Sequence, residues 1–488
     1  MSVEHSRALK LAEGVSGKTA SALERHLDSS AVVVSVDSEM PQAHLTARTL
    51  VSTLRRGPGE IVLLASGLDD SFITELQESS AAIDPIRGIS VRNESDRIPP
   101  GSVRVHVGPR LQAPAIRVAP EGYGAHIAAS SAAVIRIRRP GNEIGAVYTA
   151  SLGAAEVFKH TAVVSANRRV LHRHLRFCPI TLSGDLLAAP DLPTGRAFDI
   201  TLVGIGAIGT GIVYLLDVLG AEGRIVLIDR QRFALENLGT YSIGGVADVE
   251  EGPWKVDLAK RFLRRFDVVP VPGAVSDAIQ SVDAGKIAWT STVLSALDSP
   301  EARRDTQRLW PDRLIDAQTG DTMLGFCDYR YGIDPCMFCV FPPGQGPSGA
   351  ELVAERLGLS AQELADPGAI LTEADLHGKT AEQQNLLRPH VGKPMCGLAQ
   401  ATGLSGLDAD GFMPSVPFIS LQAASLSVAR LVAGMNGTYT VGSNFVQYDG
   451  LFGPQAATIE TMKRRPGCVC SARASSIEAV RASRGRQK

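Results

Sequence analysis

The sequence carries almost no net charge, because 49 lysines and arginines balance 51 aspartates and glutamates and leave −2 at pH 7. This gives no electrostatic basis for binding nucleic acid or an anionic membrane. The N-terminus has no basic segment followed by an apolar core, so we see no export signal. The longest apolar stretch, residues 417–435, is interrupted by Gln422, serines and Arg430, which favours a buried helix over a membrane span. We therefore expect a cytoplasmic protein with no nucleic-acid or membrane partner.

Cysteines are few, and their number does not suit a disulfide framework. Seven occur in 488 residues, and an odd number without an export signal indicates a reducing compartment. Four of them form two close pairs, Cys336 with Cys339 and Cys468 with Cys470. Two pairs of thiolates suit a closed tetrahedral Zn²⁺ site, the alternative being buried thiols without a metal.

The chain length predicts two α/β units, 1–190 and 195–488. In the first unit, apolar runs at 31–36 and 60–65 flank a helical segment at 41–55, a pattern typical of parallel strands. No glycine-rich turn follows a strand in this half. We therefore expect a scaffold without a site of its own.

The second unit predicts a doubly wound parallel sheet, because strands and helices alternate in it. We expect strands at 198–203, 224–229 and 292–297, and helices at 207–220 and 253–266, the latter with Pro253 in its first turn. A polar insertion occupies residues 343–411. The short basic end, 473–488, is interpreted as a frayed tail.

A glycine-rich turn, GIGAIG, follows the first strand of this unit and opens a helix. Gly204, Gly206 and Gly209 let the backbone approach phosphate, and the helix N-terminus supplies N–H donors. Asp229 ends the next strand, where a carboxylate can accept hydrogen bonds from ribose hydroxyls. These residues fit NAD or FAD as well as ATP, and a turn without a ligand is the remaining alternative.

Later residues favour ATP over a dinucleotide. Asn237 and then Lys255 follow Asp229, and a cation that opens a helix is unfavourable unless an anion lies there. Lys255 would meet the triphosphate, or else be a solvated surface lysine. Asp298 ends another strand and could hold Mg²⁺ on the phosphates, or else cap the helix before Pro300.

Cys396 stands alone in a loop with glycine, proline and Lys393. Such a thiol is either an accessible nucleophile or a small buried residue. Cys178 and Cys327 are interpreted as buried thiols.

Residues 195–488 resemble the ubiquitin-activating enzyme superfamily, which includes the bacterial ThiF and MoeB adenylyltransferases. The matching segments run in order through GIGAIG, IDRQRFALENL, GPWKVDLAK, ALDSPEARR, DPCMFCVFP, KPMCGL and CVC. The resemblance implies an ATP-dependent, Mg²⁺-dependent enzyme that adenylates the C-terminus of a small β-grasp protein ending in glycine. The N-terminal half would then be a fused, inactive partner unit, giving a monomeric pseudo-dimer or a homodimer.

The resemblance also implies roles for single residues. Asp229 would bind ribose, Asn237 and Lys255 the phosphates, and Asp298 the Mg²⁺, with Arg303 nearby. The four paired cysteines would hold structural Zn²⁺. Pro394-Met395-Cys396-Gly397 looks like the family's Pro-x-Cys-Thr motif, so Cys396 would form a thioester and pass the small protein to a conjugating enzyme with an acceptor cysteine. A role in bacterial antiviral conjugation is a further implication.

Two positions depart from the family pattern, because Gln231 replaces an aspartate and Thr240 an arginine. An arginine from the N-terminal unit is expected to supply the missing contact. The alternative functions are a sulfur-carrier adenylyltransferase without a thioester step, an NAD(P)-dependent oxidoreductase, and a binding module without catalysis.

Overall fold

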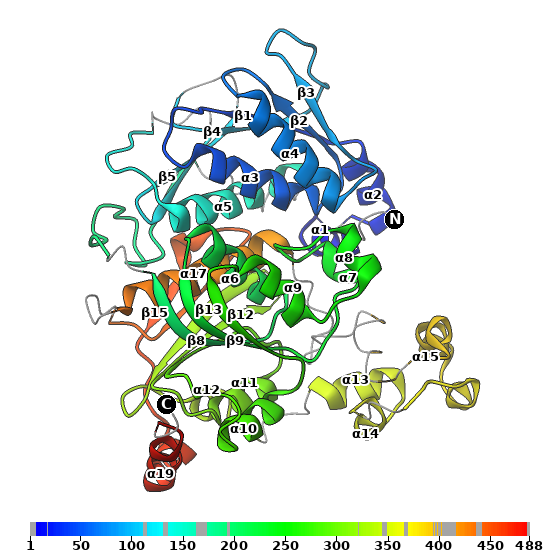
Figure 1. The fold of residues 1–488 in the computed structure, drawn as a ribbon. Coiled ribbons are helices and arrows are strands. Elements are labelled where there is room, and N and C mark those ends of the chain that lie inside the picture. The colour runs from blue at the N-terminus through cyan, green and yellow to red at the C-terminus, as the bar shows by residue number, and fades with distance from the viewer. Residues whose placement is uncertain are drawn as a thin grey trace.

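The structure is a computed structural model, and it describes a large part of the chain. The described residues are 6–16, 18–110, 115–129, 135–162, 173–192, 196–320, 322–343, 349–365, 369–393, 395, 398, 402, 416–435 and 442–485. They form two sheets with helices, as Figure 1 shows. The prediction of a mixed α/β fold with two parallel-dominated sheets is confirmed.

The N-terminal sheet has the strand order β3-β2-β1-β4-β5-β6-β7. Its first five strands in this order run parallel, and β6 pairs antiparallel with β5 on one side and with β7 on the other. The strands are β1 (Ala31–Val36), β2 (Glu60–Leu64), β3 (Ile89–Arg92), β4 (Val103–Val107), β5 (Ile116–Glu121), β6 (Gly124–Ala128) and β7 (His174–Phe177). The helices are α1 (Ser6–Ser16), α2 (Ala20–Asp28), α3 (Ala43–Arg55), α4 (Asp70–Ile83) and α5 (Glu143–Thr161).

The C-terminal sheet has the order β10-β9-β8-β11-β12-β13-β14-β15. Its strands are β8 (Ala197–Val203), β9 (Glu222–Ile228), β10 (Phe266–Val271), β11 (Thr292–Ser295), β12 (Arg313–Gly320), β13 (Met323–Arg330), β14 (Phe445–Asp449) and β15 (Thr458–Glu460). The helices around it are α6 (Ala207–Val218), α7 (Leu235–Leu238), α8 (Val246–Glu251), α9 (Lys255–Phe262), α10 (Val275–Asp283), α11 (Pro300–Gln307), α12 (Met337–Val340), α17 (Pro417–Ala433), α18 (Val469–Ala472) and α19 (Ala474–Gly485).

The two sheets share one topology over seven strands. In the N-terminal sheet, β1 pairs in parallel with β2 on one side and with β4 on the other. In the C-terminal sheet, β8 pairs in parallel with β9 on one side and with β11 on the other. The equivalent helices α3 and α5, and α6 and α17, pack together in a layer between the sheets (Figure 1). All 17 residues of α17 are buried because the helix faces its own sheet on one side and α5 on the other.

The insertion forms a small helical module at the side of the molecule (Figure 1). It contains α13 (Gly349–Leu357), α14 (Ala361–Ala365), η1 (Glu373–Leu376), α15 (Ala381–Leu387) and η2 (Arg388–His390). A separate apolar cluster, which includes Leu357, Leu371 and Leu387, holds these turns together.

Two local predictions are wrong. Helix α9 begins at Lys255, so Pro253 lies before the helix and not in its first turn. The reason is that this segment bonds to residues 232–233 instead: Trp254 pairs with Arg232 in a β-bridge, and Phe233 N donates to Pro253 O. Residues 474–485 form helix α19 where we expected a frayed tail. Arg481 and Arg484 anchor this helix by donating to the carbonyls of Trp310 and Leu309.

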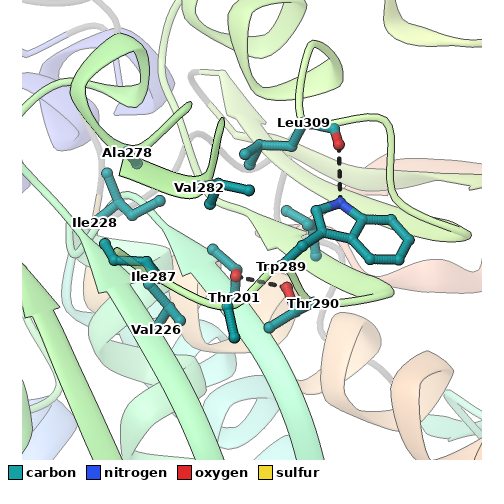
Figure 2. A pocket seen from close by; sticks show the side chains of 11 residues that line it. Thr201, Val226, Ile228, Ala278, Val282, Ile287, Trp289, Thr290 and Leu309 are labelled. Atoms are coloured by element: carbon teal, nitrogen blue, oxygen red, sulfur yellow. Dashed lines mark hydrogen bonds between the residues drawn. The ribbon is translucent and has the colours of Figure 1, made fainter. Parts of the chain in front are cut away.

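No helix in the described ranges is both long enough and apolar enough to cross a bilayer. Figure 2 shows an internal cavity of about 10 Å³ under the C-terminal sheet, beside Trp289 and the hydrogen-bonded pair of Thr201 and Thr290. A volume of about 10 Å³ holds at most one water. This cavity is therefore a packing defect and not a ligand site.

Candidate nucleotide site and cysteine cluster

The glycine-rich turn lies at the carboxyl end of β8, at the N-terminus of α6. Gly204 adopts φ +88°, and a Cβ there would lie 2.6 Å from the Ala296 carbonyl oxygen. A Cβ at Gly209 would collide with the Gly204 carbonyl oxygen. The protein's own packing therefore requires these two glycines.

Gly206 differs from its two neighbours in the motif. It has an ordinary φ of −85° as the N-cap of α6, and a Cβ there would have no atom of the described residues within 4 Å. Neither backbone strain nor packing explains a glycine at this position. Open space beside a helix N-terminus fits an anionic group, so the turn can accommodate phosphate.

Asp229 connects the end of β9 to the glycine-rich turn. Its Oδ2 accepts a hydrogen bond from Ile205 N at 2.7 Å, and its Oδ1 accepts one from Gln231 N at 2.8 Å. Each carboxylate oxygen has a second lone pair, so the side chain can also accept hydrogen bonds from ribose hydroxyls. The structure thus places Asp229, the residue predicted to bind ribose, directly beside the glycine-rich turn.

Lys255 is buried, with 1% of its surface exposed, and this contradicts the alternative of a solvated surface lysine. Its Nζ donates to Gln231 Oε1 at 2.6 Å and lies 5.1 Å from the centre of the Tyr241 ring. Burial acts to lower the pKa of Lys255, but Tyr241, Asp229 and Glu236 together outweigh burial and raise the pKa above its ordinary value. The lysine therefore carries its charge at neutral pH. Gln231 holds it through an amide oxygen where the family has an aspartate.

Asn237 and its loop are positioned from both halves of the chain. Asn237 is 2% exposed, and its Oδ1 accepts a hydrogen bond from Ala234 N at the start of α7. Arg56, at the end of α3, donates to the carbonyl oxygens of Leu238 at 2.5 Å and Gly244 at 3.2 Å. Burial lowers the pKa of Arg56 to about 9. An N-terminal arginine therefore braces the loop in which Thr240 replaces the family's arginine.

Asp298 follows β11 and is exposed. It forms no hydrogen bond or ion pair that the structure records among the described residues. Ser299 caps α11, because its Oγ accepts a hydrogen bond from Ala302 N at 3.2 Å. The alternative role of Asp298 as a helix cap is therefore wrong, and its carboxylate is available to a cation.

A buried ion pair supports the turn that presents Asp298. Arg303 donates through Nε and Nη2 to the carbonyl oxygen of Leu297 at 3.2 and 2.8 Å, and its Nη1 lies 3.4 Å from Asp316 Oδ2. Asp316 lies in β12 and is fully buried, and its Oδ1 has no partner among the described residues. Burial raises the pKa of Asp316, while Arg303 opposes this. Sequence reasoning missed Asp316, although a carboxylate within the apolar strand RLIDA was a visible sign of it.

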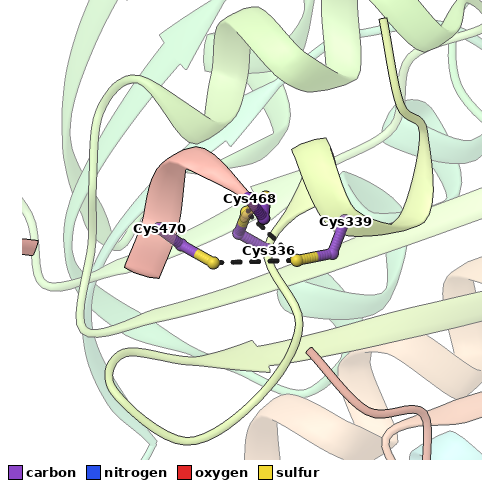
Figure 3. Close-up of side chains that lie close together, drawn as sticks. All are labelled: Cys336, Cys339, Cys468 and Cys470. Carbon is purple, nitrogen blue, oxygen red and sulfur yellow. Dashed lines mark hydrogen bonds between the residues drawn. The ribbon is translucent and has the colours of Figure 1, made fainter. Parts of the chain in front are cut away.

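The four paired cysteines meet at one point, as Figure 3 shows. The Sγ–Sγ distances are 3.6 Å for Cys336 and Cys468, 3.6 Å for Cys339 and Cys470, and 3.9 Å for Cys336 and Cys339. These distances are too long for disulfides. A tetrahedron with Zn–S bonds of about 2.3 Å has S–S edges of about 3.8 Å, so the cluster fits a metal ion of that size.

Two of the remaining cysteines lie outside this group of four. Cys178 and Cys327 are buried as expected, and burial raises the pKa of Cys327 to about 12. Cys396 lies outside the described residues, so its role stays a prediction.

The predicted nucleotide residues converge at one sheet edge. The carboxyl ends of β8, β9 and β11 bring together the turn at 204–209, Asp229 and Asp298, and α9 adds Lys255. This is the topological switch point, where ligands bind in open α/β sheets. The arrangement offers backbone N–H donors, one buried cation and two carboxylates to a metal-bound nucleotide.

The chain is similar to several known proteins. The chain is 28% identical over 274 residues to the uncharacterized protein y4jF of Sinorhizobium fredii (strain NBRC 101917 / NGR234), and the match covers 53% of this chain and 46% of that relative. Similar solved structures are E. coli MccB with MccA-N7isoASN and E. coli MccB alone, both 16% identical and covering 57% of this chain, with TM-scores of 0.36 and 0.35. The matched regions cover 68% and 66% of the two MccB chains, respectively. The ThiF family model matches residues 187–470, more than half of the 488 residues, and the chain therefore belongs to the ThiF family.

Proposed function

We propose that this protein uses Mg-ATP to adenylate the C-terminal carboxylate of a small ubiquitin-like protein that ends in glycine. Membership of the ThiF family supports adenylyltransferase chemistry in general. The division of the chain into an inactive unit, 1–190, and an active unit, 195–488, belongs to the same proposal. The shared topology of the two sheets supports that division.

The burial of Lys255 is the observation that carries the proposal. The side chain is 1% exposed and opens α9, where a cation opposes the helix dipole. Such a residue is costly to the folded protein unless an anion neutralises it. Its position beside the glycine-rich turn and Asp229 supports a phosphate of the nucleotide as that anion.

The chemical step follows from these positions. A carboxylate oxygen of the substrate attacks the α-phosphorus of ATP, the bond from this phosphorus to the bridging oxygen breaks, and pyrophosphate leaves. Amides of the turn and Lys255 would stabilise the charge that develops on the phosphate oxygens, while Asp229 would hold the ribose. Asp298 would hold Mg²⁺, which neutralises the phosphates and the leaving pyrophosphate when it is bound.

The finer part of the proposal is a second transfer to Cys396. Its thiolate would attack the acyl carbon of the adenylate, AMP would leave, and the resulting thioester would pass to the cysteine of a conjugating enzyme. The cysteine cluster would hold structural Zn²⁺ and fasten α18 and α19 to the end of β13. The sequence motif supports the thioester step, and the sulfur distances support the metal.

ATP–pyrophosphate exchange with a candidate partner protein tests the adenylation step. We expect Mg²⁺-dependent exchange in the wild type and a loss of about 10²–10³-fold in Lys255→Met, because one charge-stabilising contact is removed. Lys260→Met is the matched control, because Lys260 is exposed on the same helix and should leave exchange unchanged. Equal exchange in both variants, or preferential binding of NADH over Mg-ATP, would overturn the proposal.

The thioester step has its own test. With Cys396→Ala we expect exchange to persist and a conjugate that thiols can cleave to disappear from gels run without reductant. If neither the wild type nor the variant forms such a conjugate, the chain stops at the acyl adenylate, as in a sulfur-carrier adenylyltransferase.

A further inference from the structure

The N-terminal sheet contains a cavity of about 190 Å³ that the proposed adenylation does not use. It is lined by the carboxyl end of β1 and by the loops that follow β1, β2, β3 and β4, through residues that include Ser35, Asp37, Glu39, Ser66, Glu94 and Arg110. Residues from four separate loops therefore line one pocket, and this pocket opens to solvent, since the side chains of Arg110 and Glu39 are 63% and 79% exposed.

The cavity lies at the topological switch point of its sheet. Strand β1 pairs with β2 on one side and β4 on the other, as β8 pairs with β9 and β11. Ligands bind outside the carboxyl ends of the strands at such a point. The cavity therefore has the same place in its sheet as the nucleotide turn has in the other.

The chemistry of this cavity is opposite to that of the nucleotide turn. Where GIGAIG follows β8, the sequence Asp37-Ser38-Glu39 follows β1. Arg110 Nε lies 3.2 Å from Asp37 Oδ2, and its Nη2 lies 2.6 Å from Glu39 Oε2. With Glu94, the lining holds three carboxylates against one guanidinium. This charge repels phosphate and attracts a cation.

A buried polar group behind the wall lacks a partner. His106 is 1% exposed, its Nδ1 lies 2.9 Å from the Oγ of Ser35, and its Nε2 has no hydrogen bond among the described residues. Both this Nε2 and the Asp37 Cβ lie within 3 Å of the point where a Cβ of Gly108 would stand. Unpaired buried polar atoms are rare in folded proteins and often indicate a missing partner. The unpaired Nε2 belongs to a His106 ring that lies behind Ser35 and Asp37, two residues of the lining.

We propose that this cavity binds the ammonium or guanidinium group of a small organic cation. A volume of 190 Å³ exceeds the ~10–15 Å³ that one water needs and is below the ~300 Å³ of a drug-sized pocket. It therefore suits a short amine or one basic side chain. Glu94 and Glu39 would pair with the cation, and the hydroxyls of Ser35 and Ser66 would accept its remaining hydrogen bonds. The source is either a free amine or a lysine or arginine of a partner protein.

Calorimetric titration of the full chain at low ionic strength tests this, with putrescine and the blocked peptide acetyl-Gly-Lys-Gly-amide as probes. We expect the wild type to bind at least one probe and Glu94→Gln to weaken binding about tenfold, as loss of ~1.4 kcal/mol predicts. Arg110→Gln should strengthen binding, because it frees Asp37 and Glu39. Glu78→Gln removes the same charge from an exposed position on α4 and should change nothing.

The two sources give different outcomes. Tighter binding of putrescine indicates a free amine, and tighter binding of the peptide indicates a protein side chain. Failure of both probes to bind at millimolar concentration would overturn the inference, as would equal affinity in Glu94→Gln and the wild type. All three exposed-site variants should retain their unfolding temperature and ATP–pyrophosphate exchange, so a failure here leaves the proposed adenylation untouched.

Discussion

Replacing Arg303 with methionine tests whether the buried pair with Asp316 supports the metal-binding turn. The change removes both hydrogen bonds to the Leu297 carbonyl and the positive charge beside Asp316, which keeps the hydrogen bond from Gln318 Nε2 at 3.1 Å. Removal of one member of a buried ion pair costs about 3–5 kcal/mol, because the other charge stays buried without compensation. We expect a loss of this size in the free energy of unfolding at pH 7.5.

The loss should depend on pH in a defined direction. Burial raises the pKa of Asp316 above 3.8 in the folded protein, and loss of Arg303 raises it further. A carboxyl group whose folded pKa is raised binds its proton more tightly when folded, so stability falls as pH rises through that pKa. The difference between Arg303→Met and the wild type should therefore shrink as pH falls from 7.5 toward 5.

Urea unfolding, followed by tryptophan fluorescence at both pH values, measures these differences. Asp316→Asn in the Arg303→Met background removes the uncompensated charge, so the double variant should be more stable than Arg303→Met alone at pH 7.5. The apparent affinity for Mg²⁺ in the exchange reaction should also fall, because the turn before Asp298 loses its anchor. A loss below about 1 kcal/mol, or one equal at both pH values, would refute the reasoning.

Three further outcomes are expected. Cys468→Ser should lose bound zinc, measured by elemental analysis of the purified protein, and should lower the unfolding temperature, since one of four thiolates is removed; equal zinc content in variant and wild type would contradict the site. Arg56→Met should speed amide hydrogen exchange in residues 238–244 and weaken nucleotide binding, because two carbonyls lose their donor; unchanged exchange there would contradict the bracing role. Gly209→Ala should fail to give folded protein, because its Cβ meets the Gly204 carbonyl; a stable variant would show that the turn can relax.

The sequence predicted the local elements and the residues that converge on the nucleotide site. Buried runs such as 31–36 and 198–203 and the glycine-rich turn follow from short-range patterns, and they agree with the structure. The cysteine pairs also meet, although 132 residues separate Cys336 from Cys468. Residue type and spacing were enough here, because each pair lies in a short segment of defined geometry.

What the sequence could not predict depends on contacts between distant segments. The burial of Lys255 requires the side chain of Gln231 and the ring of Tyr241. The bracing by Arg56 crosses 182 residues to Leu238, and no motif marks it. The cavity at Asp37 arises from four loops that only the folded sheet brings together, so a half that seemed to lack a site contains one candidate.

Equilibrium binding of Mg-ATP to the wild type and to Gly206→Ala tests the central claim most directly. The alanine Cβ would enter space that no atom of the described part of the chain fills, so the fold should keep its unfolding temperature within the small cost of changing a helix N-cap. If phosphate occupies that space, calorimetry should show Mg-ATP binding in the wild type and binding about tenfold weaker or more in the variant. Equal affinity in the two proteins, or no binding by the wild type at millimolar Mg-ATP, would contradict the account.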